Sequence, residues 1–221
     1  EGTCWLVESI EELSEIPDFF VLNADLETAS DDPQKSSINP WHNCRPIGTA
    51  ITGDMCKKSW FVPWPIGGAE WFQRKLNHAL VWVNQNVKYD AHVVSNWGCH
   101  IPSGLKLLCT VAHAHLVDAD RSYKGGYGLE ALAKAWLGPE FQKRKDLIKP
   151  YLVKNKDFGR IPIDILGLYA CYDVITNRAL FKYLVEHLPP ESMALYENEI
   201  ELTYVLFSME RVGLHINPVE V

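Results

Sequence analysis

The sequence predicts an α/β fold in which a mixed central β-sheet is flanked by helices. Short runs rich in β-branched and aromatic residues gather in the first half of the chain, and longer runs with helical periodicity gather in the second half. The chain has 221 residues, of which 47% are hydrophobic and 22% are charged, and this composition is typical of a globular protein. Such a length can bury one substantial core.

The first half of the chain predicts strands joined by turns and short helices. Ser9 and Glu12 form a capping-box pattern, which opens a short helix that reaches about Ile16. The polar stretch 52–58 separates two apolar runs and predicts a hairpin. A helix is expected over 69–78. The expected strands cover 4–9, 19–27, 46–51, 59–64 and 80–83.

The second half of the chain predicts helices. The stretch 84–98 is typical of a turn that enters a helix, which ends at Gly98. Pro189 and Pro190 stop the last long helix because proline cannot continue it. The other expected helices cover 105–117, 128–138 and 163–188.

Two carboxylates stand one residue apart in the strand expected at 19–27. Because successive strand side chains point to opposite faces, Asp25 and Glu27 share one face. The apolar residues on the other face are Phe20, Leu22, Ala24 and Leu26. Two like charges side by side repel, and a hard divalent cation such as Mg²⁺ removes that repulsion. The pair therefore predicts a metal site, provided that the chain supplies further acids.

Two other acids are candidates for completing this metal site. Asp90 follows an expected strand and falls in the opening turn of the next helix; it could also simply favour the helix dipole, with Asn86 as the N-cap. Tyr169 and Asp173 are four residues apart and share one face of a mostly apolar helix. A hydrogen bond between Tyr169 and Asp173 is the alternative interpretation of that pair.

The cysteines and the charge pattern leave other interpretations open. Six cysteines lack a CxxC pair and are expected to be reduced and mostly buried, although a zinc site could be assembled from Cys99, His100, Cys109, His113 and His115.

The net charge of −7 argues against a protein that holds duplex nucleic acid by charge alone, but it allows an enzyme that meets phosphate through metal ions. The basic segment 142–160 predicts either a solvated surface or one that follows a nucleic-acid backbone.

Taken together, three motifs resemble the DEDD superfamily of 3′-5′ exonucleases. They are DxE at 25–27, an Asp after "QNVKY" at 85–89, and YxxxD at 169–173. One subgroup has a His five residues before the last Asp, where this chain has Leu168, so Tyr169 indicates the other subgroup. The stretches "WVNQNVKYDAHVV", "YGLEALAKAWLG" and "FGRIPIDILGLYACYDVITNRALF" are similar to the proofreading exonuclease domain of family A DNA polymerases, of the DNA polymerase I type.

This resemblance implies a ribonuclease H-like exonuclease fold and a division of the chain. Residues 1–188 would form the 3′-5′ exonuclease domain. Residues 189–221 would form a helix and connector leading into a polymerase domain that lies outside this chain. No stretch has the ~20 continuous apolar residues of a membrane span, and the N-terminus lacks the basic and apolar regions of a signal peptide. We therefore expect a protein that is intracellular rather than secreted and has no membrane partner. Because the sequence does not begin with Met, we also expect it to be a fragment or a processed product.

The resemblance also implies a mechanism with two Mg²⁺ ions, for which Mn²⁺ could substitute. Asp25 would bridge both ions, Glu27 and Asp173 would complete the first site, and Asp90 would hold the second. Tyr169 would orient the attacking water. The products would be nucleoside 5′-monophosphates.

Further residues are implied as substrate contacts. Gln85 and Asn86 match positions that contact the terminal nucleotide in the family, and Thr28 lies beside the metal acids. The expected substrate is DNA with a single-stranded or frayed 3′ end, because a mismatched terminus unpairs at lower cost.

Two alternatives share these motifs. One is a ribonuclease D-like exonuclease that trims RNA, against which the closing "MERVGLHIN" argues. The other is a non-catalytic exonuclease-like domain beside a polymerase, although such domains have lost metal acids that this chain retains.

Overall fold

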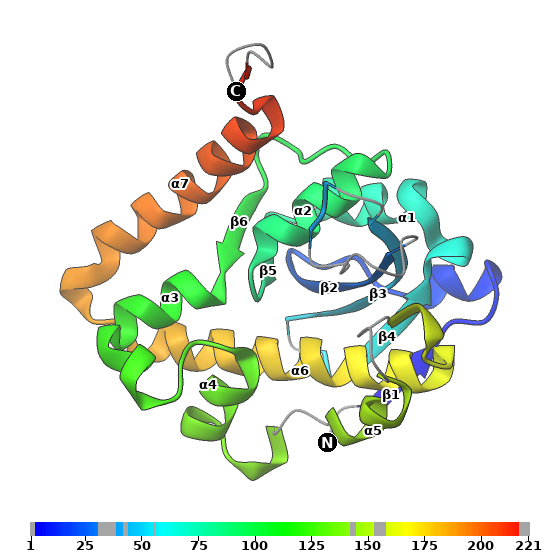
Figure 1. Ribbon diagram of the computed structural model, residues 1–221, viewed down its shortest axis with the longest axis horizontal. Coiled ribbons are helices and arrows are strands. Elements are labelled where there is room, and N and C mark those ends of the chain that lie inside the picture. The colour runs from blue at the N-terminus through cyan, green and yellow to red at the C-terminus, as the bar shows by residue number, and fades with distance from the viewer. Residues whose placement is uncertain are drawn as a thin grey trace.

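A computed structural model describes residues 3–30, 39–41, 44–54, 56–141, 145–152 and 158–216 of the chain. Its centre is a six-stranded sheet with the strand order β1-β4-β3-β2-β5-β6 (Figure 1). The strands are β1 (Thr3–Leu6), β2 (Val21–Ser30), β3 (Cys44–Gly53), β4 (Lys58–Pro63), β5 (Val81–Asn84) and β6 (Lys106–Cys109). β2, β3 and β4 pair antiparallel, whereas β1 with β4, β2 with β5, and β5 with β6 pair parallel. The predicted mixed sheet of an α/β fold is thus confirmed.

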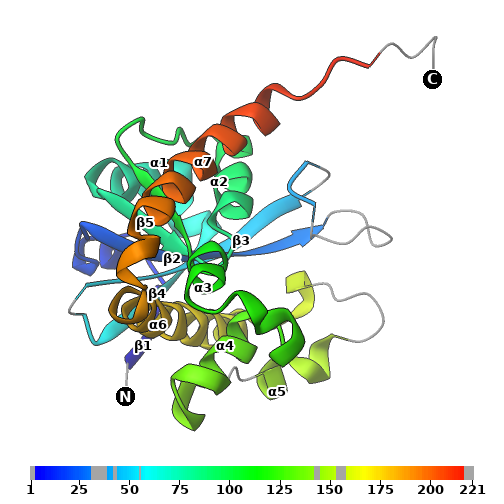
Figure 2. The ribbon, with the colours of Figure 1, turned by 90° about the vertical axis from the view of Figure 1, so that its left-hand side faces the viewer.

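Helices cover both faces of this sheet. The α-helices are α1 (Trp64–His78), α2 (Val87–Asn96), α3 (Thr110–Val117), α4 (Leu129–Trp136), α5 (Lys145–Ile148), α6 (Ile163–His187) and α7 (Met193–Val212). Short 3₁₀ turns lie at Glu11–Glu15, Ala119–Lys124, Pro139–Phe141, Lys149–Tyr151, Phe158–Arg160 and Pro190–Ser192. Figure 2 shows α1 and α2 on one side of the sheet and α6, with α4 and α5, on the other. The long helix α6 therefore forms the floor beneath most of the strands.

The alternation of β2 decides which face of the sheet carries charge. Leu22, Ala24 and Leu26 are buried in the core with residues of α1 and α2. Asp25 and Glu27 alternate with them and therefore face α6. The sheet thus has one apolar face and a pair of acids on the other, which is the arrangement that the alternation predicts.

Strand β2 extends well beyond its pairing with β5. β2 has ten residues, but only Val21, Leu22 and Asn23 pair with the four-residue strand β5. Beyond Asn23, that edge of β2 is released from β5, and α2 starts three residues after β5 ends. The start of α2 therefore lies beside the unpaired edge of β2, where Asp90 meets the Leu26 amide.

Several sequence-based expectations need correction. The stretch 105–117, predicted as one helix, contains strand β6 followed by α3, because its apolar start pairs in parallel with β5. Phe20 does not fill the apolar face: it lies just before β2, is 62% exposed, and stacks on His78 at 5.2 Å. Ser9 and Glu12 do interact, with 3.3 Å between Oγ and Oε1, but the helix that follows is a 3₁₀ turn that begins at Glu11.

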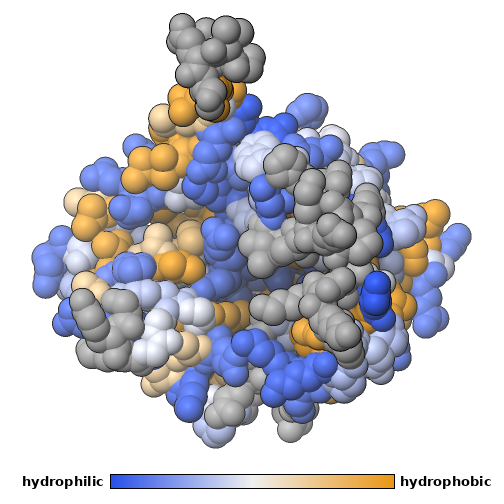
Figure 3. Space-filling model, viewed as in Figure 1, coloured by the Kyte–Doolittle hydropathy of each residue, from blue (hydrophilic) through white to orange (hydrophobic). Residues whose placement is uncertain are grey.

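Helix α7 follows the two prolines and packs against β6, α2 and α3. In Figure 3, hydrophobic side chains gather along its outward side. The exposed apolar residues of this helix are Met193, Leu195, Leu202, Val205, Leu206, Met209 and Val212. No helix in the described part of the chain has the length and apolar character needed to cross a membrane.

Candidate active site

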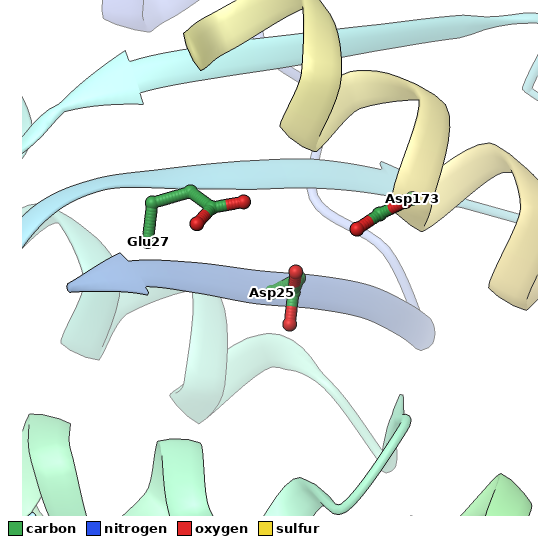
Figure 4. A group of neighbouring side chains, drawn as sticks. All are labelled: Asp25, Glu27 and Asp173. Carbon is green, nitrogen blue, oxygen red and sulfur yellow. The ribbon is translucent and has the colours of Figure 1, made fainter. Parts of the chain in front are cut away.

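Three carboxylates converge between β2 and α6 (Figure 4). Asp25, Glu27 and Asp173 each offer one oxygen, and these atoms all lie within 4.8 Å of one another. Glu27 is 7% exposed and Asp173 is 5% exposed, so most of this negative charge is withdrawn from water. Carboxylate oxygens are the ligands that Mg²⁺ and Mn²⁺ prefer, and a cation offsets the repulsion among the three acids. The donor set therefore fits a hard divalent ion.

Asp90 joins this group from the other layer of helices. Its Oδ1 accepts a hydrogen bond from the Leu26 amide at 3.0 Å, on the edge of β2 that β5 has released. Its Oδ2 accepts from Asn84 Nδ2 at 2.8 Å, and the same nitrogen donates to Asp25 Oδ1 at 2.7 Å. One amide thus links the two carboxylates. Burial, and then the nearby charge of Asp25, raise the pKa of Asp90 well above its usual range.

Asn84 and Asn177, which no sequence motif singles out, form a buried amide relay. Asn177 Nδ2 donates to Asn84 Oδ1 at 3.3 Å, and this contact fixes which end of the Asn84 amide faces the acids. The Thr110 hydroxyl lies 2.9 Å from Asn177 Oδ1. A sequence signal did exist for Asn177, since it follows Asp173 by four residues and therefore shares its helix face.

The three residues predicted to contact substrate occupy different environments. Gln85 is held at both ends of its amide, because Nε2 donates to the Tyr127 carbonyl at 2.7 Å and Oε1 accepts from Thr110 at 2.6 Å. The Thr28 hydroxyl shares a 2.9 Å hydrogen bond with the Tyr89 hydroxyl. Asn86 is exposed and has left-handed backbone angles, φ 62° and ψ 46°. Asparagine adopts these angles more readily than any residue except glycine, so the conformation fits a tight turn between β5 and α2.

Tyr169 lies one helical turn before Asp173 and is 4% exposed. Its ring centroid lies 6.3 Å from that of Phe158. Two residues earlier, Gly167 lets α6 approach the sheet closely, because a Cβ at Gly167 would lie 2.9 Å from Cδ1 of Phe61 in β4. This close approach brings Asp173 within reach of the acids on β2.

The alternative interpretations find less support. Within the described residues, Asp25, Glu27 and Asp173 form the one group of acid, His or Cys side chains close enough to share an ion, and it contains none of the residues of the zinc alternative. Much of the basic segment, including Lys143, Arg144, Lys154 and Lys156, lies outside the described residues. Lys145 pairs with Glu130 at 2.7 Å on an exposed surface.

Comparison with known proteins also indicates a 3′-5′ exonuclease. Residues 6–189 match a family model described as 3′-5′ exonuclease. The DNA polymerase DpoZ of Acinetobacter phage SH-Ab 15497 is 25% identical over 180 residues, which cover 71% of this chain and 28% of that protein. The DNA polymerase DpoZ of Salmonella phage PMBT28 is 22% identical over 199 residues, which cover 84% of this chain and 31% of that protein. The chain thus spans less than a third of the length of these relatives.

Solved structures with a similar fold include nucleases. RNase D of Trypanosoma brucei superimposes with a TM-score of 0.68 at 14% identity and covers 92% of this chain and 72% of its own. NrnC of Brucella melitensis with bound Mg²⁺ gives a TM-score of 0.64 at 14% identity, covering 96% of this chain and 94% of its own. These similarities confirm the predicted ribonuclease H-like exonuclease fold.

Proposed function

Because this chain belongs to the 3′-5′ exonuclease family, we propose that it is the proofreading domain of a family A DNA polymerase and hydrolyses phosphodiester bonds at DNA 3′ ends. The observation that carries the proposal is the convergence of Asp25, Glu27 and Asp173 on one point. The two phage DNA polymerases that resemble this chain support the polymerase context. Nucleoside 5′-monophosphates are the expected products.

The carboxylates divide into two sets that meet at Asp25. Asp25 lies with Glu27 and Asp173 on the α6 side, and it shares the Asn84 amide with Asp90 on the α2 side. Each set would hold one divalent ion, Mg²⁺ or Mn²⁺, and the ions would supply a more acidic water and neutralise charge on the phosphate. Tyr169, one turn from Asp173, is the residue that would orient the attacking water through its hydroxyl.

The expected substrate follows from the way in which carboxylates and metal ions act on a phosphodiester. Carboxylates that act on a phosphodiester through ions carry no base code, so sequence preference is not expected. A frayed 3′ end enters more readily than a paired one, which makes a mismatched terminus the preferred substrate. Removal of mismatched termini beside a polymerase is proofreading.

A ribonuclease D-like exoribonuclease is the second candidate. One observation favours it: a solved complex of Trypanosoma brucei RNase D with RNA U12 superimposes with a TM-score of 0.67 at 15% identity. Such a similarity concerns the fold, which nucleases of DNA and RNA share. The polymerase relatives therefore weigh more heavily for the substrate.

The first experiment is single-turnover digestion of a 5′-labelled DNA oligonucleotide and its RNA counterpart, with Mg²⁺ and with EDTA. The intact chain is compared with Asp25→Asn and Asp173→Asn, which remove charge at nearly constant shape. Asp164→Asn is the matched control, because Asp164 is an exposed acid in the first turn of the same helix α6. We expect a Mg²⁺-dependent ladder from the DNA 3′ end that the control retains.

Both site variants are expected to lose more than roughly 100-fold in rate, beyond the range typical of residues that only support a metal ligand. Faster digestion of RNA than of DNA would favour the ribonuclease D-like candidate. Binding of DNA without cleavage by the intact chain would instead indicate a non-catalytic platform.

A further inference from the structure

One carboxylate of α7 holds two residues of α2, the helix that carries Asp90. Glu210 Oε1 lies 2.6 Å from Lys88 Nζ, and Glu210 Oε2 lies 2.7 Å from His92 Nε2. Glu210 stands beyond residues 6–189, which match the family model. The contact therefore joins α7 to the helix that supplies one of the four acids.

Glu210 contacts the face of α2 that lies opposite Asp90. Lys88 and His92 are four residues apart and share one face of the helix. Asp90 lies midway between them, about 200° around the helix from each. Its carboxylate is bound on that opposite side by the Leu26 amide and by Asn84. Helix α2 is thus held between Glu210 on one face and the edge of the sheet on the other.

Neighbouring groups keep this contact in place. The His92 side chain is 3% exposed. Its ring centroid lies 4.5 Å from that of Trp41 and 4.7 Å from that of Phe207 in α7. One residue after Glu210, Arg211 hydrogen-bonds Asn96 at the end of α2 and lies over the Trp41 ring at 5.5 Å. Helix α7 therefore contacts α2 near both ends of α2.

We propose that Glu210 is a positioning residue for Asp90, and that α7 is in this way a part of the nuclease site. The inference rests on the proposed function, because it assigns Asp90 to the metal acids. Without the Glu210 carboxylate, Lys88 and His92 lose their shared partner and α2 can move away from β2. Asp90 then meets Asp25 at a less favourable separation, and the site binds divalent ions more weakly.

The test measures metal binding directly and also through the reaction. Mn²⁺ binding to the intact chain is followed by electron paramagnetic resonance, and the exonuclease rate is measured across a Mg²⁺ titration. The variants are Glu210→Ala, which removes both contacts, and Glu210→Gln. Glutamine can accept from Lys88 with its oxygen and donate to an unprotonated His92 ring nitrogen with its amide. Glu201→Ala is the matched control, since Glu201 is an exposed acid of the same helix.

We expect Glu210→Ala to raise the Mn²⁺ dissociation constant and the half-maximal Mg²⁺ concentration roughly tenfold, the lower end of the range for residues that orient metal ligands. The rate at saturating Mg²⁺ should stay close to that of the intact chain, Glu210→Gln should restore most of the loss, and Glu201→Ala should change neither constant.

Unchanged Mn²⁺ binding in Glu210→Ala overturns the positioning role. An equal loss of rate at every Mg²⁺ concentration, together with a lower melting temperature, also overturns it, because it shows a contribution to stability alone. If the intact chain binds Mn²⁺ but cleaves nothing, the proposed function fails while the comparison of Mn²⁺ constants still decides the role of Glu210. If the intact chain binds no Mn²⁺, both proposals fail.

Discussion

Gly167→Ala tests whether the close approach of α6 to the sheet positions Asp173. The added Cβ would lie 2.9, 3.1 and 3.2 Å from Cδ1, Cγ and Cβ of Phe61, a side chain with no exposed surface. Phe61 cannot retreat, because its ring also lies against the backbone of β3 at Gly48, where a Cβ would meet Phe61 Cε1 at 2.8 Å. The helix must therefore shift outward.

Two effects of opposite sign set the magnitude for Gly167→Ala. Overpacking a tight core costs about 1–3 kcal/mol, whereas replacing glycine by alanine inside a helix stabilises it by about 1 kcal/mol. The net loss in the free energy of unfolding is therefore about 0–2 kcal/mol. In a chain of 221 residues this corresponds to a fall in melting temperature of up to about 8 °C.

The assay combines thermal unfolding with the exonuclease rate. Because α6 carries both Tyr169 and Asp173, we expect the rate to fall more steeply than the stability does. Gly104→Ala is the control, since a Cβ there meets nothing within 4 Å. A higher melting temperature for Gly167→Ala, with the rate unchanged, would show that helix propensity outweighs the contact with Phe61 and would refute the reasoning.

Two further predictions follow from buried polar groups. Asn84→Ala removes the donor shared by Asp25 and Asp90, so we expect Mn²⁺ affinity and nuclease rate to fall by about 10–100-fold; an unchanged Mn²⁺ titration would contradict this. His113 is buried, and burial lowers its pKa to about 4. As the pH falls from about 6.5 to 4, the unfolded chain takes up a proton that folded His113 refuses, so the free energy of unfolding decreases by up to about 3 kcal/mol. Denaturant unfolding at pH 7 and pH 5 should therefore show a smaller loss in His113→Leu, and an identical pH dependence would rule out His113 as the cause.

Much of the fold could be predicted because local patterns agree with the tertiary structure. The alternation along β2 predicts both its buried face and its pair of acids, and the structure shows both. The prediction of one helix over 105–117 was wrong because the short apolar start of this stretch fits a strand or a buried helix equally well. Only the parallel pairing of β6 with β5 decides between them. The prediction for Phe20 was wrong because the alternation continues one residue before β2 begins, where the side chain is 62% exposed.

The candidate site was less open to prediction than the fold. Asp25, Glu27 and Asp173 carry charge in apolar surroundings, so each attracts notice in the sequence. Asn84 is a neutral amide at the end of a strand, and nothing local distinguishes it from a residue that caps a turn. Its importance arises from two carboxylates that approach the same nitrogen, and this can be seen only in three dimensions.

The amide relay also determines when, during folding, a working site can exist. Asn84 is separated in sequence by 59 residues from Asp25 and by 93 residues from Asn177. Contacts of such separation form late, because the entropy of closing long loops must be overcome before they contribute. The hairpin of β3 and β4 can form early, while β5, α2 and α6 must all be in place before the acids meet. An incompletely folded chain, such as one still emerging from a ribosome, is therefore expected to have no nuclease activity until α6, which carries Asp173, has packed on the sheet.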